Sequence, residues 1–318
     1  MGLSRGAIVL AVIGLSFILP AAICVTVLAA PVGSVLDGAL ILVGAALWMA
    51  ALSLVNWWEF VGLAWRRIWW AALVAGSAWR FWAWPSSSRT FASGSATLAS
   101  AVLAAGAGWL AARALLARRH AGTATALAFP LRGGRYLVTD GGDGAMCALV
   151  NYHYGFGRHR ASGVSASMRY AVDVVEVGRG GRESVGFVPR ENAAYHIWER
   201  ALMAPCDGIV VHVVDGVADN HAFGANRPYG VGNHVVFRCA DDVYVVLGHM
   251  RCGSVRVRAG QTITAGTTIG CVGNSGWTER PHLHMQAMRS ETADWWHGDP
   301  VPMRFEGRFP VRNQVVAT

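Results

Sequence analysis

The sequence contains no lysine, so all 27 of its basic residues are arginine. Without lysine, covalent attachment of biotin or lipoate is excluded, and with it a carrier domain of that kind. The six cysteines form no CxxC pair, which excludes a zinc ribbon. The second half of the chain has no basic stripe with interleaved aromatic residues, so we expect no nucleic-acid partner. Internal repeats and low-complexity tracts are also absent.

Acidic residues are scarce in the first 120 residues. Only Asp37 and Glu59 oppose eight arginines there, so this part carries +6 of the chain's net charge of +8. Basic residues that flank apolar runs are typical of membrane proteins. A length of 318 residues leaves room for about two domains. We therefore predict a membrane region over 1–120 and a second domain over 121–318.

Long apolar runs support this division. A helix needs roughly 20 apolar residues to cross the hydrocarbon core, and the runs at about 7–30, 38–58 and 96–116 are long enough. Pro20 is expected to kink the first of them. The run at 68–84 is shorter, rich in tryptophan and interrupted by Arg80, so it is either a fourth span or a helix in the interface plane. The lipid bilayer is thus an expected partner.

After Phe129 the pattern changes to short runs rich in Val and Ile, separated by turn residues. We predict strands at 135–139, 170–177, 208–215, 233–238, 243–249, 254–258, 268–272 and 282–288, and a helical patch at 191–202. The predicted fold class is mostly β, an antiparallel sandwich or barrel with its core at 129–290, preceded by the transmembrane helices. Cys239 and Cys252 could form a disulfide across a hairpin in an oxidising compartment; free thiols are the alternative.

The sharpest local motif is the sequence PHLH at 281–284. Residues two apart in a strand face the same side, so His282 and His284 point into one space. Buried imidazoles need polar partners, and a metal with a neighbouring acid–base group would supply them. This pair therefore indicates a metal site.

Several further motifs precede that pair in a fixed order: APCDGIV at 204–210, GNHVV at 232–236, YVVLGHM at 244–250 and VRVRAGQTITAGTTIG at 255–270. Together with the PHLH motif, this set resembles the lysostaphin/LytM family of zinc metalloendopeptidases, whose domains have the duplicated hybrid motif fold and act on peptidoglycan. The resemblance covers roughly 129–288. It implies one Zn²⁺ ion, a peptidase activity and peptidoglycan peptides as substrate.

The resemblance also implies a set of zinc ligands. His284 matches the second histidine of the family's HxH motif, and Asp173 matches its aspartate. The family's upstream histidine lies four residues before the aspartate, where this chain has Arg169. A divergent branch draws that ligand from an Asn-x-His element further upstream, so we predict His153, with His159 as the alternative.

Two imidazoles and one carboxylate with an open fourth position are typical of catalytic zinc. Such an ion lowers the pKa of a bound water toward about 7. The resemblance places His249 and His282 beside this water, one to accept its proton and the other to hold the developing oxyanion. The sequence does not assign these two roles. Asn233 is expected to serve the substrate groove.

The resulting expectation is a zinc endopeptidase of bacterial peptidoglycan in the inner membrane, with several spans and an extracytoplasmic C-terminal domain. Arginines at 5, 66–67 and 118–119 instead suit four spans with both termini in the cytoplasm, so the enzymatic hypothesis requires three spans or an external N-terminus. One alternative is a catalytically silent LytM-like domain that regulates another wall hydrolase as its protein partner. The other is a phosphotransfer module that uses the paired histidines.

Overall fold

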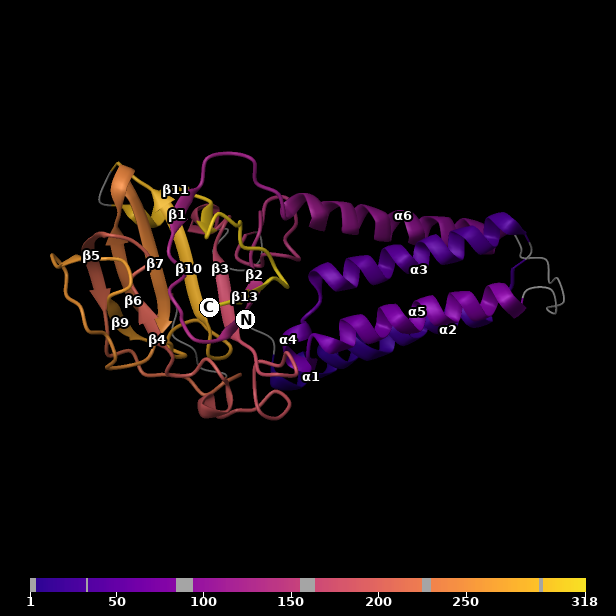
Figure 1. Cartoon of the computed structure of the whole chain (residues 1–318), viewed down its shortest axis with the longest axis horizontal. Helices are drawn as coiled ribbons and strands as arrows, with labels where there is room; N and C mark the ends of the chain where they lie inside the picture. Colours follow the sequence, from indigo (N-terminus) through magenta and orange to yellow (C-terminus); the bar gives the residue numbers. More distant parts are fainter. Residues whose placement is uncertain (1–3, 33, 84–93, 155–163, 225–229, 292–293) are drawn as a thin grey trace.

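A computed structural model describes residues 4–32, 34–83, 94–154, 164–224, 230–291 and 294–318. The chain divides into an elongated helical arm and a globular part built on a sheet (Figure 1). The arm contains helices α1 to α6, and the strands all follow them in sequence. The chain as a whole is therefore mixed helix and sheet, with apolar helices first and antiparallel sheets after them, as predicted; the sandwich or barrel form of the second part stays a prediction.

The arm consists of four long helical segments. α1 (Arg5–Ile13), a π-helical turn (Gly14–Ile18) and α2 (Leu19–Ala29) form the first; α3 (Val35–Val55), α5 (Ala64–Ala83) and α6 (Gly94–Ala117) form the others. The short helix α4 (Trp58–Val61) joins α3 to α5 at the end of the arm that meets the globular part. Each of the four predicted apolar runs thus corresponds to one of these segments, apart from a few residues at the ends of the runs.

Pro20 lies in the first turn of α2, directly after the π-helical turn. Proline lacks a backbone N–H and its ring crowds the preceding turn. The wider turn at Gly14–Ile18 accommodates this loss locally. The structure thus has a π-helical turn directly before the position of the expected kink.

Three helical segments are long and apolar enough to cross a membrane among the residues that the structure describes: Arg5–Ala29, Val35–Val55 and Thr97–Ala117. α5 has a similar length of 20 residues but carries Arg66, Arg67 and Arg80. Arg80 donates to the carbonyls of Leu28 (2.5 Å) and Ala30 (2.7 Å), so it caps the free end of α2. α5 consequently stays alongside α2 in the arm (Figure 1).

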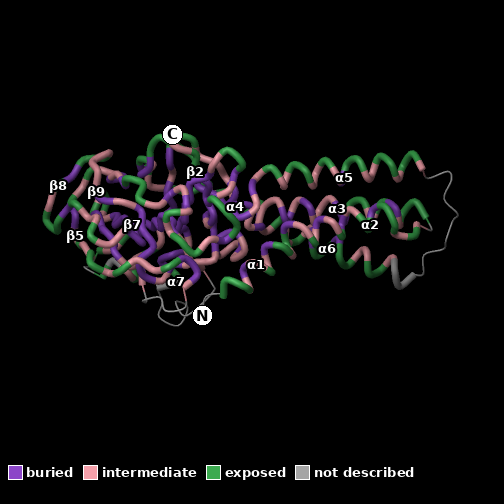
Figure 2. Tube along the Cα trace, turned by 90° about the horizontal axis from the view of Figure 1, so that it is seen from below, coloured by how far each residue is buried: buried purple, intermediate pink, exposed green. Residues whose placement is uncertain are grey.

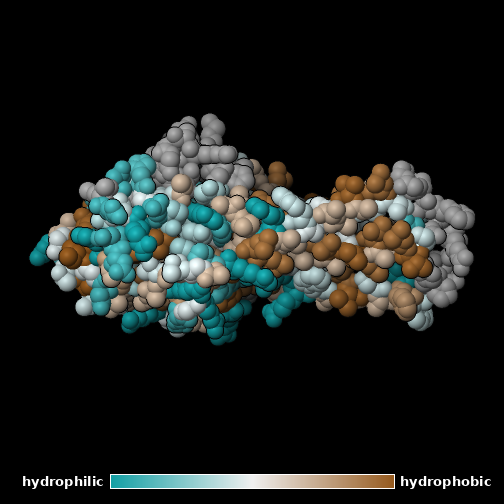
Figure 3. Space-filling view, turned by 90° about the horizontal axis from the view of Figure 1, so that it is seen from above, coloured by the Kyte–Doolittle hydropathy of each residue, from teal (hydrophilic) through white to brown (hydrophobic). Residues whose placement is uncertain are grey.

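The arm is packed tightly along its axis and apolar outside. A Cβ on Gly44 of α3 would lie 3.3 Å from the Cβ of Ala104 of α6, so these two helices are in close contact. Met49 of α3 and Leu73 of α5 pack with Ile23 of α2. Figure 2 shows mostly intermediate and exposed residues along the arm, and Figure 3 shows its hydrophobic surface beside a more hydrophilic globular part. Such a surface suits an apolar environment.

The globular part is built on a nine-stranded sheet, with strands in the order β13-β2-β3-β10-β7-β6-β5-β8 and β11 paired to β10. All its pairs are antiparallel. The bounds are β2 Arg135–Asp140, β3 Val172–Glu176, β5 Gly208–Val214, β6 Asn233–Arg238, β7 Val243–Met250, β8 Thr262–Ile263, β10 Leu283–Arg289, β11 Asp299–Pro300 and β13 Val315–Ala317.

Two small sheets complete the globular part. β1 (Thr125–Leu127) pairs in parallel with β12 (Met303–Phe305), and β4 (Ala201–Met203) pairs antiparallel with β9 (Thr268–Cys271). The remaining short elements are α7 (Val164–Ser167) and the 3₁₀ turns Asn192–Ala194, Ala240–Asp242 and Trp295–His297. The main core is formed by apolar side chains from β3, β6, β7 and β10, including Val174, Phe237, Leu247 and Met285.

Two local predictions are wrong. Residues 254–258 form no strand. The Asp215 side chain accepts hydrogen bonds from the amides of Gly253 (2.8 Å) and Val255 (3.3 Å), and the Arg256 amide donates to the Ile269 carbonyl (2.9 Å). The segment 191–202 is not a helix. It contains one 3₁₀ turn and ends in β4, whose backbone pairs with β9.

The disulfide also differs from the prediction. Cys206 is bonded to Cys239, while Cys252 is a free thiol. Cys206 lies just before β5 and Cys239 just after β6, and these strands are antiparallel neighbours. The two cysteines are therefore brought together by the sheet register and not by a tight hairpin.

Candidate metal and catalytic site

Strand β10 places His284 in the middle of the sheet, and His282 directly precedes this strand. Leu283 and Met285 point into the apolar core, so His284 and Gln286 lie on the opposite face. β10 runs between β3 and β7, and His284 is paired with Asp173 on one side and Gly248 on the other. The antiparallel register therefore sets the carboxylate beside the imidazole.

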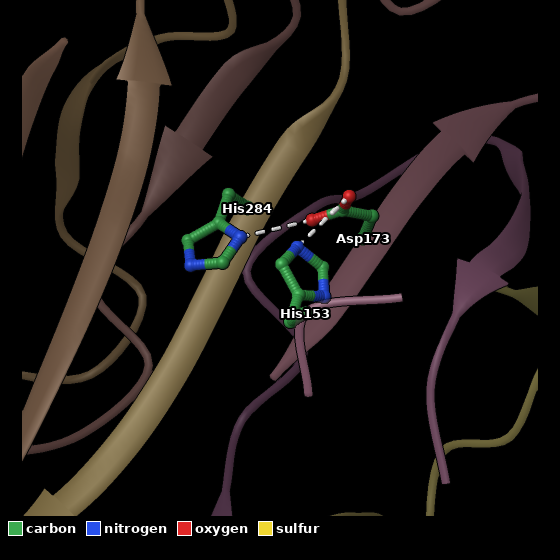
Figure 4. Close-up of side chains that lie close together, drawn as sticks. All are labelled: His153, Asp173 and His284. Carbon is green, nitrogen blue, oxygen red and sulfur yellow. Dashed lines mark hydrogen bonds and ion pairs between the residues drawn. The ribbon is translucent and has the colours of Figure 1, made fainter. Parts of the chain in front are cut away.

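Three candidate ligands converge at this point (Figure 4). Nδ1 of His284 lies 3.0 Å from Oδ1 of Asp173, and Nε2 of His153 lies 3.3 Å from Oδ2 of the same carboxylate. One ligand atom from each residue lies within 4.8 Å of the others. His153 comes from the loop after β2, so the cluster joins a loop to two adjacent strands.

The outer ring nitrogen of each candidate histidine ligand has its own acceptor. Oδ1 of Asn151 lies 3.0 Å from Nδ1 of His153, and Oε1 of Gln286 lies 2.9 Å from Nε2 of His284. The amide of Asn151 donates to the carbonyls of Gly142, Arg169 and Ala171, which fixes its oxygen toward the ring. These acceptors hold the outer nitrogen of each ring, so that the inner nitrogen faces Asp173 and would be free to bind a metal there.

His249 and His282 lie beside this cluster. Their ring centroids are 4.8 Å apart, and His249 lies 5.7 Å from the ring of His284. Nδ1 of His249 lies 2.8 Å from the Ser275 carbonyl, and Nδ1 of His282 lies 2.8 Å from the Arg280 carbonyl. Both rings therefore present Nε2 inward, and that of His282 lies 3.3 Å from Oδ2 of Asp173.

The backbone around His249 is unusual. Its φ is 59°, in the left-handed region, at the end of β7. A histidine in this region costs on the order of 1–3 kcal/mol and is typical of functional sites. Gly232 (φ 62°) allows the carbonyl that holds the ring to come close, because any Cβ there would collide with Ser275. The imidazole is thus held toward the cluster by the Ser275 carbonyl, on a backbone conformation that costs free energy.

The charges of the cluster shift its pKa values in opposite directions. Burial disfavours the charge on Asp173, but His153 and His282 outweigh it and hold the pKa of the carboxyl well below its usual range. Burial likewise opposes protonation of His153, but the Asp173 carboxylate raises its pKa to about 9. Burial, with His282 and His284, lowers the pKa of His249 well below its usual range. At His282, Asp173 outweighs burial and raises the pKa.

The structure therefore brings together His153, Asp173, His249, His282 and His284. His159 lies outside the described residues. Arg169, which stands where the family has a histidine, points to a different partner: its guanidinium forms a bidentate ion pair with Asp143 at 2.7 and 2.8 Å.

Asn233 is fully buried, and its side chain is committed to the backbone. Its amide donates to the carbonyls of Val217 (2.7 Å) and Met250 (3.1 Å), and its oxygen accepts from the amide of Val217 (2.8 Å). If Asn233 contributes to the substrate groove, it does so by holding the backbone at Val217 and Met250 in place. The sequence prediction did not include the acceptors Asn151 and Gln286, although each lies two residues from its histidine.

The cluster fits a zinc ion by its donor set. Two imidazoles and one carboxylate are ligands that zinc prefers, and three protein ligands leave a position for water. The outer acceptors on both histidines add the second layer of contacts that metal-binding histidines have. His249 and His282 lie near enough to act on a group held at the open position.

Comparison with known families gives one match, over part of the chain. Residues 198–296 match peptidase family M23. This chain contains an M23 peptidase domain. The match includes His249, His282 and His284, whereas His153 and Asp173 precede it in sequence. No curated protein matches the chain.

Solved M23 structures are similar to parts of the chain. The catalytic domain of the prophage-encoded M23 protein EnpA from Enterococcus faecalis, solved as a point mutant, is 25% identical, with 34% of this chain and 75% of that chain covered and a TM-score of 0.24. The lysostaphin catalytic domain from Staphylococcus simulans is 23% identical, with 35% and 83% covered and a TM-score of 0.24. The deep-sea M23 metalloprotease pseudoalterin is 12% identical, with 62% and 100% covered and a TM-score of 0.35.

Proposed function

We propose that this chain is a membrane-anchored zinc metalloendopeptidase that hydrolyses peptide bonds of bacterial peptidoglycan. The observation that carries the proposal is the cluster of His153, Asp173 and His284, with His249 and His282 beside it. The M23 match and the lysostaphin/LytM motifs support the reaction and the substrate class. We further propose that residues 121–318 form one domain with the lysostaphin-like, duplicated hybrid motif, with the nine-stranded sheet as its main layer.

In this proposal His153, Asp173 and His284 hold one zinc ion, which supplies an activated water and polarises the peptide carbonyl. The remaining chemistry belongs to His249 and His282. Because the Nδ1 atoms of both rings are held by backbone carbonyls, both Nε2 atoms face the site. One of them accepts the proton of the attacking water and passes it to the leaving amine. The other, as an imidazolium protonated at both ring nitrogens, donates a hydrogen bond from Nε2 to the oxyanion of the tetrahedral intermediate.

Metal removal tests the enzyme directly. We expect the purified full-length protein to contain one zinc per chain and to release peptides from purified peptidoglycan. Chelation should abolish the release of peptides, and added zinc should restore it, because the proposed reaction needs a water that the ion activates. Elemental analysis and chromatography of the products measure both quantities. A protein that holds zinc but releases no peptides would instead favour the regulatory LytM-like domain.

We also propose that the M23 domain is extracytoplasmic. The Cys206–Cys239 disulfide supports an oxidising compartment. The four long segments of the arm run alongside one another, and α1 begins at the end that meets the globular part (Figure 1). With four crossings, the N-terminus and the M23 domain lie on the same side. The arginines at that end would favour the cytoplasmic side, but two of them bind the globular part. Arg5 donates to the carbonyl of Val188 (2.8 Å), and Arg118 donates to the carbonyl of Arg312 (2.6 Å).

Reporter fusions test this orientation. A reporter that is active only outside the cytoplasm should be active when fused after Thr318, and also when fused to the N-terminus. The same fusions with a reporter active only in the cytoplasm are the matched controls and should be silent. Activity of the cytoplasmic reporter after Thr318 would contradict the proposed location and the access to peptidoglycan that it provides.

A further inference from the structure

Helix α4 of the arm carries a buried carboxylate into the M23 domain. The side chain of Glu59 is 1% exposed, and its Oε1 lies 3.2 Å from Nη2 of Arg280. Arg280 also meets Glu183, with Nε 2.8 Å from Oε1. The Glu59 carbonyl accepts the amide of Glu183 (2.9 Å), and the Phe60 ring lies 4.6 Å from the Arg280 guanidinium. One arginine is thus enclosed by groups from both parts of the chain.

The backbone of that arginine holds a histidine of the site. The Arg280 carbonyl lies 2.8 Å from Nδ1 of His282 and also accepts the hydroxyl of Thr278 at 2.8 Å. His282 in turn presents Nε2 to Asp173 at 3.3 Å. A continuous chain of contacts therefore runs from Glu59 through Arg280 to the inward nitrogen of His282.

This contact chain has a clear physical consequence. Arg280 is largely buried, with its side chain 14% exposed. Two carboxylate partners and an aromatic face fix its guanidinium, which restrains the backbone of the same residue. The imidazole is oriented by the carbonyl of that backbone. Loss of one carboxylate leaves the guanidinium with a single anionic partner and lets the segment that precedes β10 shift. Displacements of about 1 Å at a reacting group can cost on the order of 100-fold in rate.

We propose that Glu59 is a positioning residue for His282, so that the helical arm completes the peptidase site as well as anchoring it. Glu59 touches neither the substrate nor the ligand cluster and acts through Arg280. The effect on catalysis rests on the proposed function, whereas the effect on the order of the segment that holds His282 does not. An M23 domain separated from its arm would lack this restraint.

The test compares Glu59→Gln with Asp37→Asn in the full-length protein in detergent. Glu59 and Asp37 are the only acidic residues among the first 120, and Asp37 binds Ser34 and Thr97 within the arm. Glu59→Gln should lower kcat on purified peptidoglycan by about 10- to 100-fold, with KM within about twofold and the zinc content unchanged, because every ligand remains. Asp37→Asn should leave kcat within about twofold.

Hydrogen exchange supplies a readout that needs no activity. Amides of residues 278–284 should exchange at least about fivefold faster in Glu59→Gln than in the unaltered protein, with no change in Asp37→Asn. Unchanged exchange and unchanged kcat would overturn the proposal, as would equal losses in both variants. If the unaltered protein lacks zinc and activity, the proposed function fails. Hydrogen exchange still tests whether Glu59 restrains residues 278–284. Should Glu59→Gln not fold, Glu59→Asp should change kcat and exchange in the same direction by less.

Discussion

His284→Ala is expected to remove the zinc and to lower peptidoglycan hydrolysis by at least about 1,000-fold. Loss of a metal that activates water forfeits several kcal/mol of transition-state stabilisation, and each 1.4 kcal/mol is a factor of ten in rate. Nδ1 of His284 lies 3.0 Å from Asp173 at the middle of the cluster, so its loss leaves only two candidate ligands. Elemental analysis and a peptide-release assay measure the two effects.

His249→Ala is the matched control for that variant. His249 is as deeply buried, at 5% exposure against 2% for His284, and lies on the neighbouring strand. We expect His249→Ala to keep the zinc and to lower kcat by roughly 100- to 1,000-fold, the usual cost of losing a proton-transfer group or an oxyanion donor. Zinc retained at full occupancy in His284→Ala would show that the ligand set is wrong.

Local spacing in the sequence predicted much of the site. Alternation in a strand placed His282 and His284 on one face, and the same rule could have found Gln286, which lies two residues further on. The strand that carries Asp173 was also evident from its apolar residues. These predictions depend on residues close in sequence, whose relative positions are set by the period of a strand.

Contacts between distant segments could not be predicted in this way. Glu59 and Arg280 are 221 residues apart, and no pattern within either segment indicates the other. The partner of Cys206 likewise depends on the register between β5 and β6. The strand predicted at 254–258 is absent, and the amide of Val255 binds the side chain of Asp215, which lies 40 residues earlier in the sequence. Register and docking depend on the whole fold, which local periodicity does not encode.

Arg312→Ala is expected to have the largest effect on stability. The side chain of Arg312 is 1% exposed and lies between the arm and the sheet. It donates to the carbonyls of Val55 (3.0 Å) and Thr139, and it faces Asp140 (3.4 Å) and Glu59 (3.9 Å). Removing one partner of a buried ion pair costs about 3–5 kcal/mol because the other charge stays buried. The melting temperature should fall by on the order of 10 °C.

Arg238→Ala is the matched control, since Arg238 pairs with Asp242 at the surface, where the two side chains are 52% and 47% exposed. Water replaces a lost partner there, so the cost should stay below about 1 kcal/mol. Thermal unfolding of both variants in the same detergent measures the difference. If the melting temperature falls no further in Arg312→Ala than in Arg238→Ala, Arg312 is not the buried link between arm and sheet.

The stability that Arg312→Ala loses should also depend on pH. The carboxyls of Glu59 and Asp140 determine the direction of this dependence. Burial raises the pKa of Glu59 to about 7 although Arg312 and Arg280 lower it, and burial raises the pKa of Asp140 although Arg312 lowers it. Removing Arg312 removes a cation that favours both charges, so both carboxyls take up protons more readily in the folded state. Burying a protonated carboxyl costs less free energy than burying a carboxylate. Arg312→Ala should therefore destabilise the protein more at pH 8 than at pH 5. A larger loss at pH 5 would mean that neither carboxylate depends on this arginine.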